Sequence, residues 1–442
     1  MTRLITAENR TRLKSTLQVA SGNFLEMYDF MVFGYYAAAI GKAFFPSGNP
    51  LVSLLAAFMA FGAGFLMRPL GAIVLGAYTD RIGRRKGLIL TLSLMAIGTL
   101  LLALVPGYSR IGLLAPVLVL CGRLLQGLSA GVELGSVSVY LSEMATPTTR
   151  GFWVSWQSAS QQVAVIFAAF LGLALNHFLD ADQISAWGWR IPLLIGLSLA
   201  PLLFKLRASL SETVAFEAAP HHPDLAEIGS TLVRHFGVII SGMMMVMMTT
   251  VCFYLITAYT PTFGRSVLHL KAWESMLVTV CVGVTNLLWL PLSGALSDRI
   301  GRKPIMIAMT LLAILTAYPA LIWLTTAPSF MRLLAVELWL SFIFGGYNGA
   351  TVVYLTEVVP PRVRATGFSL AYSLATCLGG FTPAIATALI AYTGNKAAPS
   401  LWLSAAAVIA LIGILFSRPF ATSPAPASAV AAKAALSGEQ RG

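Results

Sequence analysis

Residues 76–86 read Gly-Ala-Tyr-Thr-Asp-Arg-Ile-Gly-Arg-Arg-Lys, and residues 294–304 read Gly-Ala-Leu-Ser-Asp-Arg-Ile-Gly-Arg-Lys-Pro. Each copy is a short charged turn between two long apolar segments. A second pattern is also repeated. Tyr-Leu-Ser-Glu, ending at Glu143 and followed by Arg150, returns as Tyr-Leu-Thr-Glu, ending at Glu357 and followed by Arg362. Two matched patterns at nearly the same offset predict two similar halves in one chain.

The composition indicates a membrane protein. Of the 442 residues, 57% are hydrophobic and only 10% are charged, whereas a soluble domain carries about 25% charged residues. Apolar runs near the roughly 20 residues that span a bilayer occur repeatedly. We therefore predict an all-α polytopic membrane protein with 12 transmembrane helices in two pseudo-symmetric six-helix halves. The predicted segments are 17–40, 51–78, 87–106, 112–141, 152–178, 189–206, 235–261, 273–296, 304–326, 331–356, 366–393 and 400–417.

The pattern divides the chain into four parts. Residues 1–206 are expected to form an N-terminal six-helix bundle and residues 234–418 a C-terminal one. The polar segment 207–233 is expected to be a cytoplasmic linker. Residues 419–442 are rich in Ala, Pro and Ser, which is typical of a disordered tail, and we expect it to be cytoplasmic.

The basic residues predict the orientation. If the N-terminus is cytoplasmic and the segments alternate, most Lys and Arg residues fall in cytoplasmic loops and tails, as the positive-inside rule requires. The net charge of +12 then reports topology, and nucleic acid is not an expected partner. The basic residues expected on the outer side are Lys42, Arg110, Arg190, Arg265, Lys271, Arg332 and Lys396.

Five charged residues are expected inside the bilayer, where an ionisable side chain is costly and therefore a functional candidate. Glu26 and Asp29 are three residues apart and share one helix face. Arg68 lies twelve residues before Asp80, about 18 Å along a helix and so near the midplane. Arg123 and Glu133 lie in the long segment 112–141. Two positive and three negative groups can also neutralise one another, so static pairing is the alternative.

The paired turns resemble the loop motif of the major facilitator superfamily. Within it, the chain is similar to the metabolite–proton symporters, and most like their citrate and tricarballylate members. The match runs from about residue 15 to 417. The motifs that carry it are Ser21–Phe30, Arg68–Gly71, Gly122–Glu133, Ser155–Gln162, Trp187–Pro192, Tyr259–Thr262 and Gly346–Gly349.

The resemblance implies proton-coupled symport of a tricarboxylate across the bacterial inner membrane by alternating access, with protons as the coupling ion and no other cofactor. Guanidinium groups grip carboxylates through two hydrogen bonds and keep their charge, so the arginines are the first substrate candidates. Asn286 is added because the repeat aligns it with Arg68. Many buried amides and phenols only tie helices together, which is the alternative for the rest. The predicted substrate-binding residues are Arg123, Arg68, Asn23, Gln126, Gln157, Gln161, Asn286, Tyr347 and Asn348.

Proton coupling needs a carboxyl group that changes partners during the cycle, because its affinity for a proton then changes as well. Asp29 and Glu26 are the first candidates and Glu133 the third. The resemblance also implies a gate made of charges that pair in the outward-open state. The alternative is that these charges only anchor the topology. The predicted gating residues are Asp80, Arg81, Arg84, Glu143, Asp298, Arg299, Arg302 and Glu357.

Other functions remain open at this point. Another metabolite, such as a dicarboxylate, shikimate or a betaine, is the nearest alternative substrate, and a non-transporting membrane sensor is the alternative function. An enzyme is not expected, since no nucleophile and base or set of metal ligands can be assembled. The cysteines Cys121, Cys252, Cys281 and Cys377 lie at unrelated spacings in apolar segments. The expected partners are a small organic anion and the lipid bilayer, with the protein working as a monomer.

Overall fold

The structure is a computed structural model that describes residues 22–82, 84–131, 133–208, 234–360 and 364–419. Of residues 22, 23, 76, 77, 79–82, 84, 85, 88, 133, 136 and 206–208, only the backbone is described. The described chain is helical and contains no strand. Because backbone groups in a bilayer must be satisfied within the segment, helices are the form that these apolar runs take.

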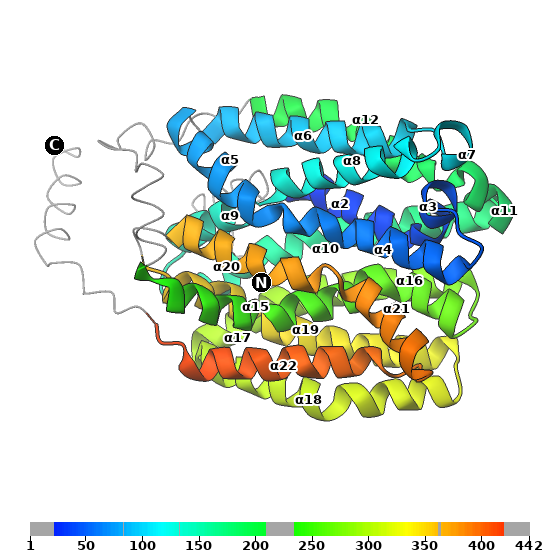
Figure 1. The fold of residues 1–442 in the computed structure, drawn as a ribbon. Coiled ribbons are helices and arrows are strands. Elements are labelled where there is room, and N and C mark those ends of the chain that lie inside the picture. The colour runs from blue at the N-terminus through cyan, green and yellow to red at the C-terminus, as the bar shows by residue number, and fades with distance from the viewer. Residues whose placement is uncertain (1–21, 83, 132, 209–233, 361–363, 420–442) are drawn as a thin grey trace, which may run out of the picture.

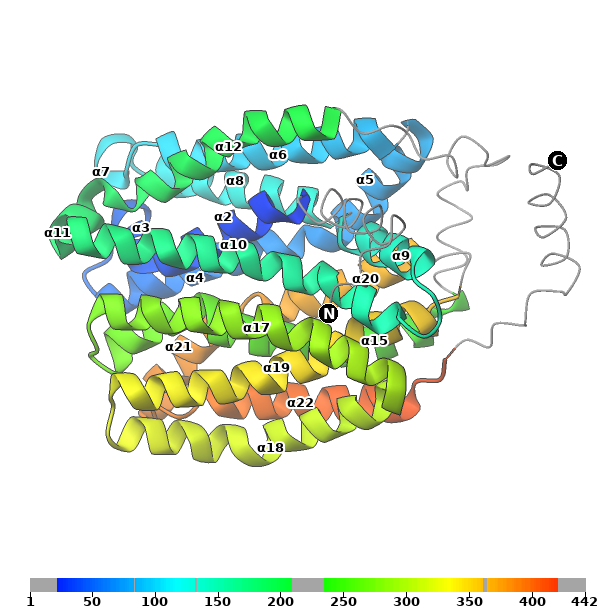
Figure 2. The same cartoon turned by 180° about the vertical axis from the view of Figure 1, so that it is seen from behind.

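The first half of the chain supplies one bundle, which Figures 1 and 2 show in blue through cyan to the green of α12, and the second half supplies the bundle beside it, in green through yellow to red. The helices of the first half are α2 (Gly22–Tyr35), α3 (Ala37–Phe44), α4 (Pro50–Leu66), α5 (Arg68–Ile82), α6 (Arg84–Leu104), α7 (Tyr108–Ile111), α8 (Leu114–Ala130), α9 (Glu133–Met144), α10 (Arg150–Phe178), α11 (Ala181–Gln183), η1 (Ile184–Gly188) and α12 (Arg190–Ala208).

Long helices dominate the second half. They are α15 (Phe236–Tyr254), η2 (Leu255–Tyr259), α16 (Thr260–Thr262), η3 (Phe263–Val267), α17 (Ala272–Ile300), α18 (Arg302–Thr326), α19 (Phe330–Val358), α20 (Arg364–Gly379), α21 (Thr382–Thr393) and α22 (Pro399–Phe416). The halves meet where α10 packs on α17 and α19, α20 packs on α4, α5 and α9, and α2 packs on η2.

Breaks within the spans have local causes. Pro69 has no N–H to bond Phe65, so α4 ends at Leu66 and α5 starts at Arg68. Pro261 separates two π-helical turns, η2 and η3, and π-helical turns are frequent at functional sites. The first break lies beside Arg68, and the second leads into the turn that carries Arg265, so both position polar groups described below.

Eight described helical spans are long and apolar enough to cross a membrane, and α11–η1 with α12 forms a bent ninth. The three remaining predicted segments correspond to α2–α3, α6 and α8–α9. Each lacks an unbroken apolar helix of sufficient length. The helix breaks at Tyr36 between α2 and α3 and after Ala130 between α8 and α9, and the apolar part of α6 covers only Ile89–Leu104. Leucines such as Leu315 (69% exposed) and Leu202 (63% exposed) give the bundle an apolar outer surface, which suits lipid.

The two ends of the bundle differ. The motif end carries the N-terminus of α10 and the C-terminus of α17. The opposite end carries the α3–α4 connection and the start of α17, and lies at the right in Figure 1.

Candidate functional site

The first buried ion pair joins α5 to α2. The Nη2 of Arg68 donates to Oε1 of Glu26 at 2.7 Å, and both side chains are buried. The guanidinium also lies 5.0 Å from the ring centre of Phe30 and 4.6 Å from that of Phe65. A buried guanidinium needs such partners, because an unpaired charge away from water costs several kcal/mol. The helix break at Met67 places Arg68 at this depth.

A second buried cation and anion are linked through an amide. Arg123 on α8 donates to Oε1 of Gln126 at 2.7 Å, and the Nε2 of Gln126 donates to Oδ2 of Asp29 at 3.3 Å. The hydroxyl of Thr99 on α6 donates to the same carboxylate oxygen. Asp29 and Arg123 are both fully buried, and Oδ1 of Asp29 has no hydrogen-bond partner in the described part of the chain. Asp29 thus has one bound and one unbound oxygen.

Phe30 connects the two arginines. Its ring centre lies 5.0 Å from the Cζ of Arg68 and 4.2 Å from that of Arg123. An aromatic face attracts a desolvated guanidinium by roughly 2 kcal/mol. The four charged groups therefore form one cluster around α2 in the first half of the chain, and a change at one is expected to be felt by the others.

A small cavity lies between the halves beside this cluster. Its volume is about 20 Å³, which is room for one or two waters and far too little for a tricarboxylate. In the state shown, the halves are closed around this central cavity. Its lining comes from both halves and consists of Met27, Arg68, Leu134, Gln161, Thr249, Thr250, Phe253, Tyr254, Phe344, Asn348, Tyr372 and Thr376.

Three predicted substrate-binding residues line this central cavity: Arg68, Gln161 and Asn348. The Oδ1 of Asn348 has no hydrogen-bond partner. The threonines of α15 and α20 in the lining were not predicted. A Thr in a helix usually bonds the carbonyl of the preceding turn, so its sequence position alone carries no signal. Thr249 is different, since its buried hydroxyl has no partner.

The structure places the other predicted substrate residues away from that lining. Arg123 and Gln126 belong to the charged cluster. Asn286 on α17 donates to Gln162 at 3.3 Å and accepts from Ser341 at 2.5 Å, so its amide ties three helices. The hydroxyl of Tyr347 donates to the carbonyl of Met245, and Gln157 accepts from Ser158. The Asn23 side chain, like that of the predicted proton carrier Glu133, lies outside the described residues.

At the motif end, Asp298 joins the two halves. Its carboxylate accepts from the backbone N–H groups of Gly151 (2.8 Å) and Phe152 (3.1 Å) at the N-terminus of α10. Arg302 pairs with Asp298 at 2.7 Å and with Glu357 at 3.3 Å. A helix N-terminus favours an anion, since its N–H groups lack intrahelical partners. Asp298 therefore caps a helix of the other half.

A glycine pair makes this contact possible. A Cβ at Gly151 would lie 2.2 Å from the carbonyl oxygen of Gly294, and one at Gly294 would lie 2.3 Å from that of Gly151. The backbones of α10 and α17 therefore touch at the motif end, where only glycine fits. The motif end is closed in this state.

Two other predicted gating residues are less engaged. Arg299 and Glu143 are exposed, and neither takes part in an ion pair with the described side chains. The side chains of Asp80, Arg81 and Arg84 lie outside the described residues. The described contacts of the repeated turn are thus those of its second copy, at Asp298 and Arg302.

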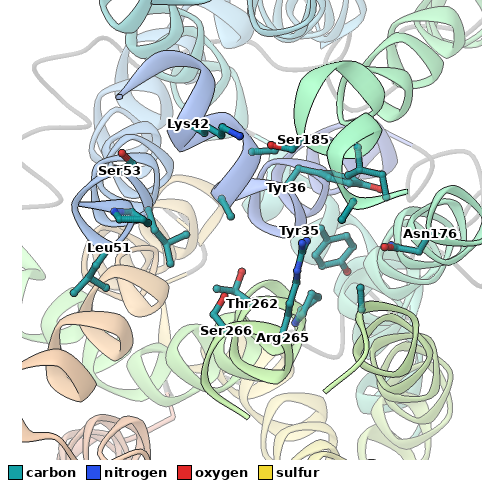
Figure 3. Close-up of a pocket in the computed structure, with 18 of the residues that line it drawn as sticks. Tyr35, Tyr36, Lys42, Leu51, Ser53, Asn176, Ser185, Thr262, Arg265 and Ser266 are labelled. Carbon is teal, nitrogen blue, oxygen red and sulfur yellow. The ribbon is translucent and has the colours of Figure 1, made fainter. Parts of the chain in front are cut away.

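The opposite end holds a much larger cavity between the halves, of about 690 Å³ (Figure 3). An aromatic layer lies between it and the central cavity. The ring centre of Phe65 is 5.1 Å from that of Tyr254, that of Phe61 is 5.8 Å from it, and Phe58 lies 6.0 Å from Tyr259. These contacts join α4 to α15 and η2. The molecule is therefore open at the opposite end as far as this layer.

Comparison with known proteins agrees with this architecture. The model of the Major Facilitator Superfamily matches residues 19–382 and 274–438. The citrate-proton symporter of Klebsiella pneumoniae is 57% identical over 415 residues, 94% of each chain. That of Salmonella typhi is 58% identical over 405 residues, 91% of this chain and 93% of its own.

A solved structure agrees in fold. The crystal structure of a D-xylose-proton symporter superposes with a TM-score of 0.73 over 91% of this chain and 96% of its own, at 20% identity. The prediction of twelve transmembrane helices in two six-helix halves is confirmed as the fold class, and the resemblance read from the motifs is confirmed as well. The protein is a multi-pass membrane transporter of a small molecule and not an enzyme, and the chain belongs to the major facilitator superfamily.

Proposed function

We propose that this protein is a symporter that carries a tricarboxylate, citrate in the first place, together with protons by alternating access. The observation that carries the proposal is the position of Arg68, which lines the cavity between the halves while its guanidinium is held by Glu26. A polyanion entering that cavity competes with Glu26 for the same cation. Two relatives of 57% and 58% identity are named citrate-proton symporters, which supports this choice of substrate.

The exchange of partners at Arg68 supplies the proton step. A substrate carboxylate that binds Arg68 takes this cation from Glu26, and the carboxylate of Glu26 then takes up a proton. Asp29 is the second carrier, because its unbound Oδ1 can accept a proton without breaking an existing hydrogen bond. When the substrate leaves on the other side, Glu26 returns its proton and pairs with Arg68 again. Protons are the only coupling ion in this scheme, and no further cofactor enters it.

We place the protein in the bacterial inner membrane as a monomer within lipid. The motif end and both termini are cytoplasmic, as the distribution of basic residues requires. The structure then corresponds to an outward-facing state in which the halves are closed at the cytoplasmic side. Asp298, capping α10 across the halves, is the latch that opens when the halves rock. Gln161 and Asn348 in the lining bind further oxygens of the substrate.

The test is uptake of labelled citrate and of tricarballylate by cells that lack other carriers, at acidic and at neutral pH, with and without an uncoupler. We expect accumulation that is faster at acidic pH and collapses with the uncoupler. Accumulation of a dicarboxylate, shikimate or a betaine instead of citrate would keep the symporter and change the substrate. Binding of citrate without any uptake would contradict transport and favour the sensor.

A further inference from the structure

The large cavity at the opposite end is lined by cations from both halves. Lys42 comes from α3 and Arg265 from η3, and both are exposed into the cavity. Figure 3 shows them on facing sides of it. The ion pairs among the described side chains are those of Arg68 and Arg302, so neither Lys42 nor Arg265 is neutralised by a described carboxylate.

The acidic residues that flank the cavity-lining segments of α11 and α17 do not face the cavity. Asp180 accepts from the backbone N–H of Gln183 at the start of α11, and Glu274 accepts from that of Lys271 at the start of α17. Neither lines the cavity, and neither does the exposed Asp182. The described part of the cavity wall is therefore positive, with no anion of its own.

Two phenols in the same wall lack partners. Tyr35 and Tyr36 are 7% and 4% exposed, both line the cavity, and the hydroxyl of each has no hydrogen-bond partner among the described residues. A buried phenol normally finds an acceptor, so two unpaired donors side by side indicate that an acceptor belongs here. Neutral hydroxyls and amides continue the lining at Asn176, Ser185 and Thr262.

We propose that this cavity is a capture site for a compact anion with two or more carboxylates, bound before the substrate passes the aromatic layer. The proposal rests on the proposed function and adds a second site to it. Its volume of about 690 Å³ is within the range of small-molecule sites, about 300–1,000 Å³. One carboxylate binds Arg265, another binds Lys42, and the two phenols donate to the remaining oxygens.

The arrangement has a consequence for closure. Because Lys42 and Arg265 belong to different halves, one anion with two separated carboxylates bridges them. A monocarboxylate or a zwitterion neutralises only one. The capture site therefore favours polyanions twice, by concentrating them at the entrance and by drawing the outer ends of the halves together only when two carboxylates are present.

The experiment compares Arg265→Gln and Lys42→Gln with the wild type and with the control Lys396→Gln, an exposed cation of the same end outside the cavity lining. We measure initial citrate uptake over a range of citrate and salt concentrations, with the amount of protein in the membrane determined for each variant. We expect KM to rise about tenfold in each cavity variant, within the range of electrostatic steering. The KM of the Lys396→Gln control is expected to stay unchanged.

Salt separates steering from a structural defect. Added salt screens the wild-type cavity and raises its KM, whereas the KM of Arg265→Gln is expected to respond weakly, and Arg265→Lys is expected to restore the response. A second measurement uses purified Arg68→Gln protein, in which citrate binding at the central cavity is impaired. We expect a residual weak citrate site that is absent from the Arg68→Gln/Arg265→Gln double variant.

Two results would overturn the capture site. One is a KM and a salt response of both cavity variants equal to those of the Lys396→Gln control while citrate uptake is normal, which would leave the proposed function standing. The other is a transported substrate with fewer than two carboxylates, which would remove this site together with the tricarboxylate assignment. Uptake of shikimate or a betaine, each with one carboxylate, in place of citrate by the wild type would show the second case at once.

Discussion

The two halves share a backbone plan but differ in chemistry. The first half buries Glu26, Asp29, Arg68 and Arg123 around α2. In the described second half, the charged side chain at comparable depth is Glu337. The first half also breaks its second and fourth spans, whereas α17 and α19 each run unbroken for 29 residues. Duplication preserved the helices, and the charges were placed in one half.

This difference divides the work of the proposed cycle. The first half holds the cation for the substrate and the carboxyl groups for the proton. The second half supplies neutral groups to the central cavity, such as Asn348 and Thr249, and the described latch at the motif end. Each prediction below breaks one part of this division or makes it sharper, from the largest expected effect to the smallest.

Removing the cation of the central cavity is expected to have the largest effect. Arg68→Gln removes the cation that pairs with the buried Glu26, and breaking such a pair costs about 3–5 kcal/mol. We expect citrate uptake to fall by about 100-fold or more while the protein still inserts. The measurement is initial uptake with membrane levels determined by immunoblot, and the double variant Arg68→Gln/Glu26→Gln tests for folding, since it removes both charges. A normal KM in Arg68→Gln would take the arginine out of the substrate site.

Neutralising the second carboxyl is expected to separate transport from coupling. Asp29→Asn keeps the size of the side chain and an acceptor for Thr99 but cannot carry a proton. We expect exchange of internal for external citrate to continue, whereas accumulation against a gradient and the acceleration at acidic pH are lost. Uptake and counterflow in the same vesicles measure the two. Normal accumulation in Asp29→Asn would leave Glu26 as the carrier and remove Asp29, with Glu26→Gln as the next variant.

A substitution of Asp298 is expected to change the balance between the outward-facing and inward-facing states and not the binding of substrate or proton. Asp298→Ala removes the cap of α10, and a lost cap costs about 1 kcal/mol, so the ratio of outward-facing to inward-facing protein is expected to fall about fivefold. A cysteine introduced by Ser266→Cys lies in the large cavity at the opposite end. Its rate of labelling with a membrane-impermeant maleimide reports the outward-facing state. We expect slower labelling in Asp298→Ala than in the Ser266→Cys parent. Equal rates would leave Asp298 as an anchor of topology.

The sequence could predict the fold because the deciding signals are local and repeated. These signals can be counted directly along the sequence: the paired turns, the lengths of the apolar runs and the twelve residues from Arg68 to Asp80. Arg68 does lie at the central cavity. Helix rotation could not be predicted in the same way. The repeat aligns Asn286 with Arg68, yet α17 has no break like the one at Met67. The amide of Asn286 instead hydrogen-bonds to Gln162 and Ser341.

The large cavity at the opposite end could not be predicted from the sequence for a related reason. Lys42 and Arg265 were counted only as basic residues of the outer side, and Tyr35 and Tyr36 as part of an apolar run. Their common position depends on how the ends of the two halves face each other across about 690 Å³, which no spacing within either half encodes.

Glu337 gives the smallest expected effect and the sharpest test of the division between the halves. The repeat aligns it with Arg123, but its Oε1 accepts from Thr260 at 2.8 Å, its Oε2 has no partner, and it does not line the central cavity. In Glu337→Gln the amide oxygen can accept the same hydrogen bond, so uptake and accumulation are expected to stay within about twofold of the wild type, since one neutral hydrogen bond contributes only about 1 kcal/mol. The matched variant is Asp29→Asn, also an acid-to-amide change at a buried carboxyl. Should Glu337→Gln lose accumulation as Asp29→Asn is expected to, the second half carries a proton site too, and the separation of charge into one half describes where the arginines lie but not where the coupling occurs.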